Sequence, residues 1–126
     1  MASLGFELYA TEHTSLTLQE AGIERVVVLH KISENTKKPN ISDYLANGAI
    51  SLVINIPVYG ESIVDQGILA DEYSIRRLAV EYNIPVVTTI ELALAIVEAL
   101  QYLRFQDPEI LSLTDYVNPK TLPRIN

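Results

Sequence analysis

Four short apolar runs are spaced along the chain, and each predicts a β-strand. They lie at residues 5–10, 25–29, 50–56 and 85–88. The first run alternates and is rich in β-forming side chains, which is typical of a strand. The second and third have uninterrupted aliphatic centres at residues 26–28 and 52–54. Such centres favour strands that are buried on both faces, as in a parallel sheet.

Capping residues and helical periodicity between these runs predict four helices. We expect the helices over residues 14–21, 41–46, 72–82 and 90–104. Their expected N-caps are polar residues that accept from backbone N–H groups: Thr14, Asn40, Asp71 and Thr89. Gly22 and Asn83 are expected to end the first and third helices. The fourth helix is apolar almost all round, so we expect it to pack against the sheet and its neighbours.

Strand and helix alternate four times, and this pattern sets the fold class. It predicts an α/β fold with a parallel sheet, right-handed crossovers and helices on both faces, in three α/β/α layers. A chain of 126 residues fits one domain. We expect that domain over residues 1–106, followed by a C-terminal extension over residues 107–126.

Charge and composition narrow the function classes. A net charge of −7 disfavours nucleic acid as a partner. The chain has no cysteine, which excludes thiolate metal sites and fits a reducing, cytoplasmic location. Apolar runs stay shorter than the roughly 18 residues that span a bilayer, so we expect no membrane partner. His13 and His30 lack metal-ligand spacing, and we expect no metal and no cofactor.

Polar residues follow the predicted strands at the edge where parallel sheets bind ligands. Thr11 and Thr14 follow the first strand, His30 and Lys31 the second, and Asn55 the third. The threonines stand at a helix N-terminus, which favours an anion, and Lys31 adds a full charge. A purely structural interpretation stays open, in which Thr14 caps the helix and Asn55 closes a turn.

Signals for catalysis are weak in this sequence, and we expect no catalytic residue in the domain. It has neither common glycine-rich phosphate loop nor a Gly-x-Ser-x-Gly elbow. A carboxylate pair, such as Glu12 with Asp65 or Asp71, is conceivable, but nothing in the sequence brings those residues together.

Three separated motifs carry a family resemblance over residues 4–104. They are Gly-Phe-Glu-Leu-Tyr-Ala-Thr-Glu-His-Thr at 5–14, Asn-Gly with Leu-Val-Ile-Asn at 47–55, and the stretch at 73–89 that ends Asn-Ile-Pro-Val-Val-Thr-Thr. In this order they resemble the methylglyoxal-synthase-like (MGS-like) domains. The third motif is most similar to the C-terminal allosteric domain of the carbamoyl-phosphate synthase large chain.

The resemblance implies a regulatory domain of a ligase that serves pyrimidine and arginine biosynthesis. Its implied ligand is a small anionic effector, either uridine or inosine monophosphate or an N-acetylglutamate-like compound. The implied partners are the synthase domains of the parent enzyme. The family's effector positions fall on Thr11, Thr14, Asn55 and either His30 or Lys31.

Departures from the family pattern bear on this interpretation. His13 replaces a usual glycine and narrows the anion site, and Ile56 removes a hydroxyl from the phosphate region. Methylglyoxal synthases carry a Gly-Gly-Asp type loop and a Trp-Asp-Pro segment, and the sequence has neither. A methylglyoxal-synthase-type lyase is therefore the weaker alternative.

The family's first strand and helix have no counterpart ahead of Gly5. That strand is central in the sheet, so we expect one of three outcomes. The strand at residues 5–10 pairs directly with the strand at 50–56, two chains form a homodimer, or a missing segment comes from elsewhere. We rank the homodimer first. A structural or oligomerisation module that has lost its ligand is the alternative function.

Overall fold

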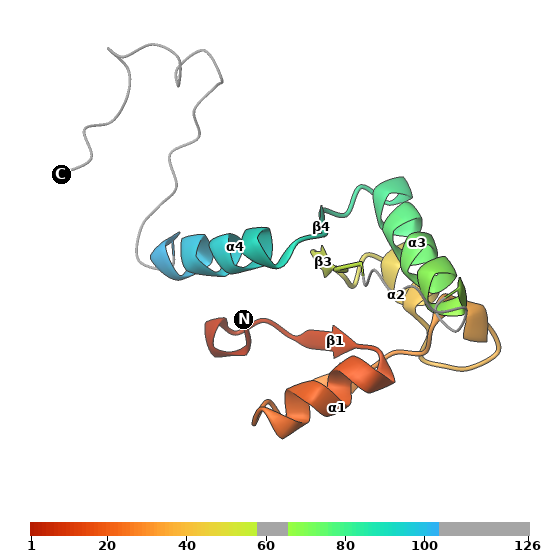
Figure 1. Cartoon of the computed structure of the whole chain (residues 1–126), viewed down its shortest axis with the longest axis horizontal. Coiled ribbons are helices and arrows are strands. Elements are labelled where there is room, and N and C mark those ends of the chain that lie inside the picture. The colour runs from red at the N-terminus through yellow and green to blue at the C-terminus, as the bar shows by residue number, and fades with distance from the viewer. Residues whose placement is uncertain (58–65, 104–126) are drawn as a thin grey trace, which may run out of the picture.

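The computed structural model describes residues 1–57 and 66–103. Its elements confirm the predicted alternation of strands and helices (Figure 1). In chain order they are η1 (Ala2–Leu4), β1 (Leu8–Ala10), α1 (Glu12–Glu20), β2 (Val26–Val28), η2 (Ile32–Glu34), α2 (Ile41–Ala46), β3 (Val53–Ile54), α3 (Gln66–Glu81), β4 (Val86–Val87) and α4 (Ile90–Leu103). The fold is α/β, as predicted. The expected C-terminal extension lies outside the described residues.

Several helix ends follow the local chemistry of the sequence. Asn40 caps α2, because its Oδ1 accepts from the backbone N–H of Ser42 at 2.9 Å. Thr89 caps α4, because its Oγ1 accepts from the N–H of Leu92 at 3.3 Å. Asn83 follows α3 with a φ of 57°, a left-handed conformation that asparagine tolerates better than most residues. These caps confirm the sequence predictions.

Two predicted caps are wrong. The N-cap of α1 is Thr11 and not Thr14, since the Thr11 carbonyl accepts from the N–H of Ser15 at 2.8 Å. The helix begins as soon as the chain leaves β1, so the earlier threonine takes the cap position. Asp71 lies inside α3, which begins at Gln66, and its carboxylate faces Lys31 instead of capping a helix.

The strands form two separate parallel sheets of two strands each. Leu8, Tyr9 and Ala10 of β1 pair with Val26, Val27 and Val28 of β2. Val53 and Ile54 of β3 pair with Val86 and Val87 of β4. Within the described residues, no backbone hydrogen bond joins β1 to β3. The direct pairing considered from the sequence is therefore not what the structure shows.

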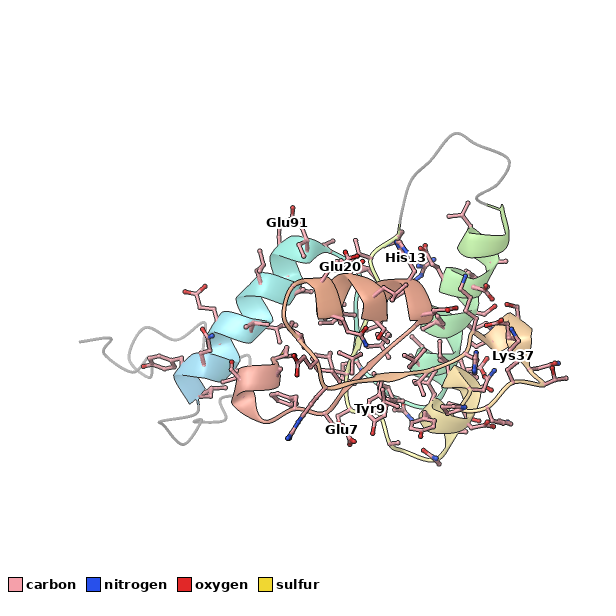
Figure 2. The ribbon with its side chains drawn as sticks, turned by 90° about the horizontal axis from the view of Figure 1, so that it is seen from below. Glu7, Tyr9, His13, Glu20, Lys37 and Glu91 are labelled. Atoms are coloured by element: carbon pink, nitrogen blue, oxygen red, sulfur yellow. The ribbon has the colours of Figure 1, made fainter. Side chains whose placement is uncertain are left out.

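A single hydrophobic core joins the two sheets through α2 and α3. Its buried members come from both halves of the chain: Leu29, Ile41, Leu45, Ala79 and Ile84. Tyr9 of β1 and Val53 of β3 pack against this cluster from the two sheets. The ring of Tyr9 also lies 5.2 Å from the ring of Tyr44 on α2. Figure 2 shows Glu7 beside Tyr9, and this carboxylate raises the pKa of the Tyr9 phenol.

The expected burial of the last helix is wrong. Ala93 is the buried side chain of α4, while several large apolar residues of the helix are exposed. They are Ile90, Leu92, Leu94, Tyr102 and Leu103. An apolar helix needs neighbours on every side to be buried, and α4 leaves the two sheets along one side of the molecule (Figure 1). In the described ranges, no helix is both long and apolar enough to cross a membrane.

Candidate functional site

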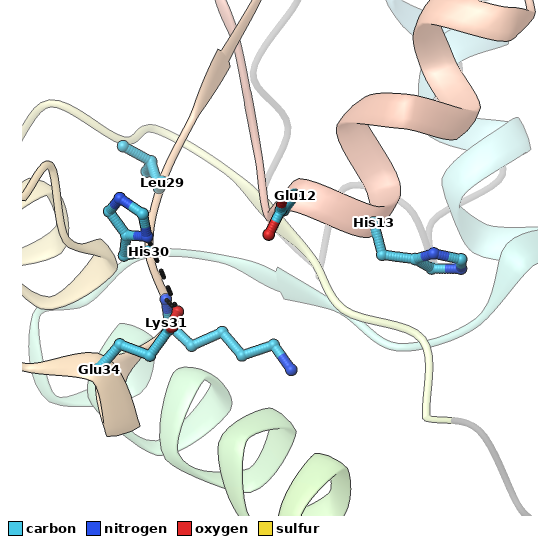
Figure 3. Close-up of a pocket in the computed structure, with 6 residues that line it drawn as sticks. All are labelled: Glu12, His13, Leu29, His30, Lys31 and Glu34. Atoms are coloured by element: carbon cyan, nitrogen blue, oxygen red, sulfur yellow. Dashed lines mark hydrogen bonds and ion pairs between the residues drawn. The ribbon is translucent and has the colours of Figure 1, made fainter. Parts of the chain in front are cut away.

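A cavity of about 250 Å³ lies between the start of α1 and the segment that follows β2 (Figure 3). Its lining comes from these two places: Glu12, His13, Leu29, His30, Lys31 and Glu34. The N–H of Leu29 donates to the carbonyl of Ala10 at 2.8 Å, so β1 and β2 end side by side. The cavity thus opens where the carboxyl ends of two parallel strands meet, the edge favoured for ligands.

Buried Asn40 fixes the segment that carries His30 and Lys31. Its side chain is completely buried, and its Nδ2 donates to the carbonyls of Lys31 at 2.8 Å and Glu34 at 3.2 Å. The backbone of His30 also pairs with this region, because its N–H donates to the carbonyl of Pro39 at 2.7 Å. The peptide bond before Pro39 is cis. The rim of the cavity is therefore tied to the start of α2.

Glu34 is the most strongly bonded carboxylate of the cavity. Its Oε1 accepts from Nζ of Lys37 at 2.6 Å, and its Oε2 accepts from the backbone N–H of Lys31 at 3.3 Å. Nδ1 of His30 lies 3.8 Å from the same Oε2. The Lys37 ammonium, followed by the Lys31 N–H, lowers the pKa of the Glu34 carboxyl. Glu34 is therefore ionised at neutral pH.

Lys31 brings a positive charge to the cavity from the end of β2. Its Nζ lies 3.8 Å from Oδ2 of Asp71, which is on α3. The Lys31 side chain is 41% exposed, whereas that of Asp71 is 14% exposed. At this separation and exposure the pair is loose, so the ammonium can turn toward a ligand without leaving a tight ion pair.

The two threonines lie beside the cavity but do not line it. Oγ1 of Thr11 and Oγ1 of Thr14 are 3.3 Å apart, on the first turn of α1. Between them in sequence stand Glu12 and His13, which do line the cavity. His13 lines the cavity from the start of α1, and in Figure 3 its imidazole points away from Lys31 and Glu34, so its narrowing of the site stays a prediction.

Asn55 is separate from the cavity lining. Its Oδ1 accepts from Nη1 of Arg76 at 2.7 Å, and its N–H donates to the carbonyl of Val87 at 2.9 Å. Nη1 of Arg76 also lies 3.8 Å from Oε2 of Glu72. Of the five predicted site residues, the structure therefore brings His30 and Lys31 into one cavity, with the two threonines next to it.

Sequence reasoning missed Glu34 and Arg76. Glu34 stands three residues after Lys31, a spacing at which side chain and backbone meet in one helical turn. Arg76 carried no local signal, because its partner Asn55 is far away in sequence. In the described part of the chain, no group of three or more histidine and carboxylate side chains is placed to hold a metal ion.

Comparisons with known proteins give the molecule its context. The family model of the MGS-like domain matches residues 1–88. The carbamoyl phosphate synthase large chain, C-terminal section, of Methanopyrus kandleri is 40% identical over 121 residues, which cover 96% of this chain and 21% of that protein. The carbamoyl phosphate synthase large chain of Synechocystis sp. is 37% identical over 117 residues, 93% of this chain and 10% of that protein.

The name of one plant relative specifies arginine. The carbamoyl phosphate synthase arginine-specific large chain, chloroplastic, of Oryza sativa subsp. japonica is 37% identical over 113 residues, 90% of this chain. That match covers 9% of the rice protein. The chain thus corresponds to between about a tenth and a fifth of the length of these relatives.

Proposed function

The chain belongs to the MGS-like domain family, and from this premise we propose that it is the regulatory domain of a carbamoyl phosphate synthase large chain. In this role it binds a small anionic effector at the cavity beside Lys31. The observation that carries the proposal is the position of this cavity. It lies at the shared carboxyl end of β1 and β2 and brings together His30, Lys31 and the first turn of α1.

The start of α1 and the Lys31 ammonium supply the attraction for an anion. Free backbone N–H groups at a helix N-terminus favour negative charge, and the hydroxyls of Thr11 and Thr14 stand on the same turn. Lys31 reaches the same cavity from the end of β2. A phosphate or carboxylate in the cavity would accept from the backbone at the start of α1 on one side and pair with the Lys31 ammonium on the other, with the threonine hydroxyls beside it.

The carboxylates of Glu12 and Glu34 constrain how the effector lies. The charge of Glu34 is offset by Lys37 and by the Lys31 N–H. Glu12 is free to accept hydrogen bonds, so the polar donors of the effector face it and the anionic group turns away. Ribose hydroxyls of uridine or inosine monophosphate, or the amide N–H of N-acetylglutamate, can serve as these donors.

Asn55 enters the proposal as a further contact, at the carboxyl end of β3 in the other sheet and outside the cavity lining. Arg76 holds Oδ1, so the Asn55 amide has one orientation, and Nδ2 is the group we expect to donate to the effector. We assign no catalytic residue and no cofactor to this domain. Its partners are the synthase domains of a cytoplasmic enzyme, to which it passes the effector signal.

Titration calorimetry tests the effector proposal. Uridine monophosphate, inosine monophosphate and N-acetylglutamate are titrated separately into the purified chain, and at least one is expected to bind. Lys31→Ala should weaken that binding by about tenfold or more, since it removes a charge-assisted contact. Lys38→Ala is the matched control, because it removes the same charge at a residue that pairs with Asp43 away from the cavity. Absence of heat with all three compounds, or equal losses in both variants, rejects the proposal.

The division of the strands into two separate sheets favours one other candidate function, an interaction module that binds no effector. Exposed apolar side chains on the strands, such as Val28 and Ile54, are typical of surfaces that a partner covers. In this case no effector binds, Thr11→Ala and Asn55→Ala leave oligomerisation unchanged, and the chain forms a stable oligomer in sedimentation experiments.

A further inference from the structure

The cavity beside Lys31 holds more negative than positive groups. Glu12 and Glu34 line it, and Asp71 pairs with Lys31 at its wall, so three carboxylates gather there. Two ammonium groups oppose them, those of Lys31 and of Lys37, which pairs with Glu34. The whole chain has a net charge of −7. An anion therefore meets an unfavourable local potential as long as the histidines of the cavity are neutral.

His30 is placed to remove this excess of negative charge. Histidine is the side chain whose ordinary titration range lies between about pH 5 and 8. His30 lines the cavity next to Lys31, and its side chain is 34% exposed. Because the ring is partly buried, its charge is screened less than that of a fully exposed group. One proton on His30 balances the carboxylates and ammonium groups of the cavity.

The backbone holds His30 at the cavity in either protonation state. Its N–H donates to the carbonyl of Pro39 at 2.7 Å, and its carbonyl accepts from the N–H of Ile41 at 3.0 Å. The charged residue of α2, Asp43, pairs with Lys38 and not with this ring. Protonation therefore changes the charge of the cavity without a rearrangement of the segment that carries His30.

Glu34 is the charged group nearest to the His30 ring. Nδ1 of His30 lies 3.8 Å from Oε2 of Glu34, which is longer than a hydrogen bond (Figure 3). This carboxylate already accepts from Nζ of Lys37 and from the N–H of Lys31. Both contacts lower the pKa of the Glu34 carboxyl, so Glu34 stays ionised throughout the histidine range. Its charge is engaged elsewhere, and a proton on His30 is left to act on a bound anion.

The second histidine of the cavity has different surroundings. His13 stands on the exposed first turn of α1, and its imidazole points away from Lys31 and Glu34 in Figure 3. It lines the same cavity as His30 but lies farther from the cation that attracts the effector. His13 is therefore an internal comparison, the same titratable group in the same cavity with a weaker expected coupling.

We propose that the effector binds together with one proton on His30, so that the domain holds its anion more tightly as the pH falls through the histidine range. This coupling rests on the proposed effector site. Anion and proton favour each other by the same factor, because coupling between two bound species is reciprocal. Above the histidine range His30 is neutral, and the affinity levels off at its lower value, with Lys31 as the attracting charge.

Titration calorimetry at two pH values tests the coupling. Uridine monophosphate, inosine monophosphate and N-acetylglutamate are each titrated at about pH 6 and about pH 8 into the unmodified chain and into His30→Gln. A nucleotide phosphate takes up a proton of its own near pH 6, but equally with both proteins. For an effector that binds, the loss of affinity from low to high pH should be about three- to tenfold larger in the unmodified chain.

Two further variants identify the charge as the cause. His30→Lys carries a permanent charge, so it should bind at about pH 8 as tightly as at about pH 6, apart from any proton on the ligand. His13→Gln is the matched control for histidine titration. Whatever its affinity, the ratio between the two pH values should equal that of the unmodified chain.

Proton NMR gives the same answer without a variant. The chain contains two histidines, so two ring signals are followed. At about pH 6.5, the effector with the lowest dissociation constant should move the His30 signal toward its protonated position. The His13 signal should move much less. This measurement decides if His30→Gln or His30→Lys does not fold.

The results separate this coupling from effector binding itself. An effector that binds with the same pH dependence to the unmodified chain and to His30→Gln contradicts the coupling and leaves the regulatory function standing. A His30 signal that stays in place on binding has the same meaning. Absence of binding by all three compounds at both pH values rejects the effector site, and the coupling with it.

Discussion

Arg76 donates from Nη1 to Oδ1 of Asn55 at 2.7 Å, across 21 residues of sequence. The contact links the middle of α3 to the end of β3, on the sheet that includes β4. Arg76 is also within 3.8 Å of Glu72, whose Oε2 is buried and accepts no hydrogen bond. The guanidinium of Arg76 thus contacts groups on a helix and at the end of a strand, including a buried carboxylate.

Replacement of Arg76 by alanine should lower the free energy of unfolding by about 1–3 kcal/mol, since it leaves Asn55 and Glu72 without their charged partner. Urea denaturation measures this value. Arg77→Ala is the control, because Arg77 pairs with Glu81 on an exposed face, with side chains 67% and 53% exposed. Its cost should stay under about 1 kcal/mol, and similar losses in both variants would remove the structural role assigned to Arg76.

Asn40→Ala should cost about 3 kcal/mol, because the side chain is fully buried and joins four partners. Its Nδ2 donates to two carbonyls, and its Oδ1 accepts from the N–H and the hydroxyl of Ser42. Thermal or urea unfolding gives the loss. Asn47→Ala, which removes one exposed contact to the N–H of Ala49, should cost far less. Equal costs would show that burial at Asn40 is not what matters.

The pH dependence of stability should carry a contribution from Glu34. Folding lowers the pKa of this carboxyl from its ordinary value of 4.5, chiefly through Lys37. The unfolded chain therefore binds the proton more readily, so the contribution is present above pH 4.5 and is lost as the pH falls below it. Glu34→Gln should flatten the acid side of a stability–pH curve. Glu20→Gln, on the exposed end of α1, should leave the acid side of the curve steeper than Glu34→Gln does. Stability–pH curves of identical shape in the two variants would contradict the prediction.

Leu45→Ala should destabilise the protein by about 3 kcal/mol, since Leu45 is 2% exposed at the centre of the core cluster. Leu94→Ala removes the same atoms from a side chain that is 63% exposed on α4. Its effect should stay within about 0.5 kcal/mol. A large loss at Leu94 would mean that α4 is packed in solution, contrary to the exposed position described above.

Local features of the fold were predictable from the sequence, and long-range ones were not. The caps Asn40 and Thr89 and the helix end at Asn83 were correct, because each depends on neighbouring residues alone. The caps Thr14 and Asp71 failed for a local reason too, since an earlier start was available to each helix. The exposure of α4 could not be foreseen, because an apolar helix can only be buried if other elements surround it.

The candidate site likewise has parts that were predictable from the sequence and parts that were not. His30 and Lys31 were found because strand ends define one edge of a parallel sheet. The cavity beside them depends on Asn40, which closes the segment from nine residues away, and on Asp71 of α3. Arg76 and Asn55 meet only when α3 packs onto the second sheet. Spacing along the chain carries no information about such a contact.

The segment from Lys31 to Pro39 is held at both ends, because the side-chain amide of Asn40 donates to the carbonyl of Lys31 and the N–H of His30 donates to the carbonyl of Pro39, while residues 35–38 at its tip are exposed. Because both ends are held, the length of the tip can change without disturbing the buried core. Doubling a loop costs only about 0.6 kcal/mol in closure entropy. A longer or different tip can therefore be accommodated at small thermodynamic cost, and it would change the surroundings of Glu34, which lines the cavity, without rebuilding the fold.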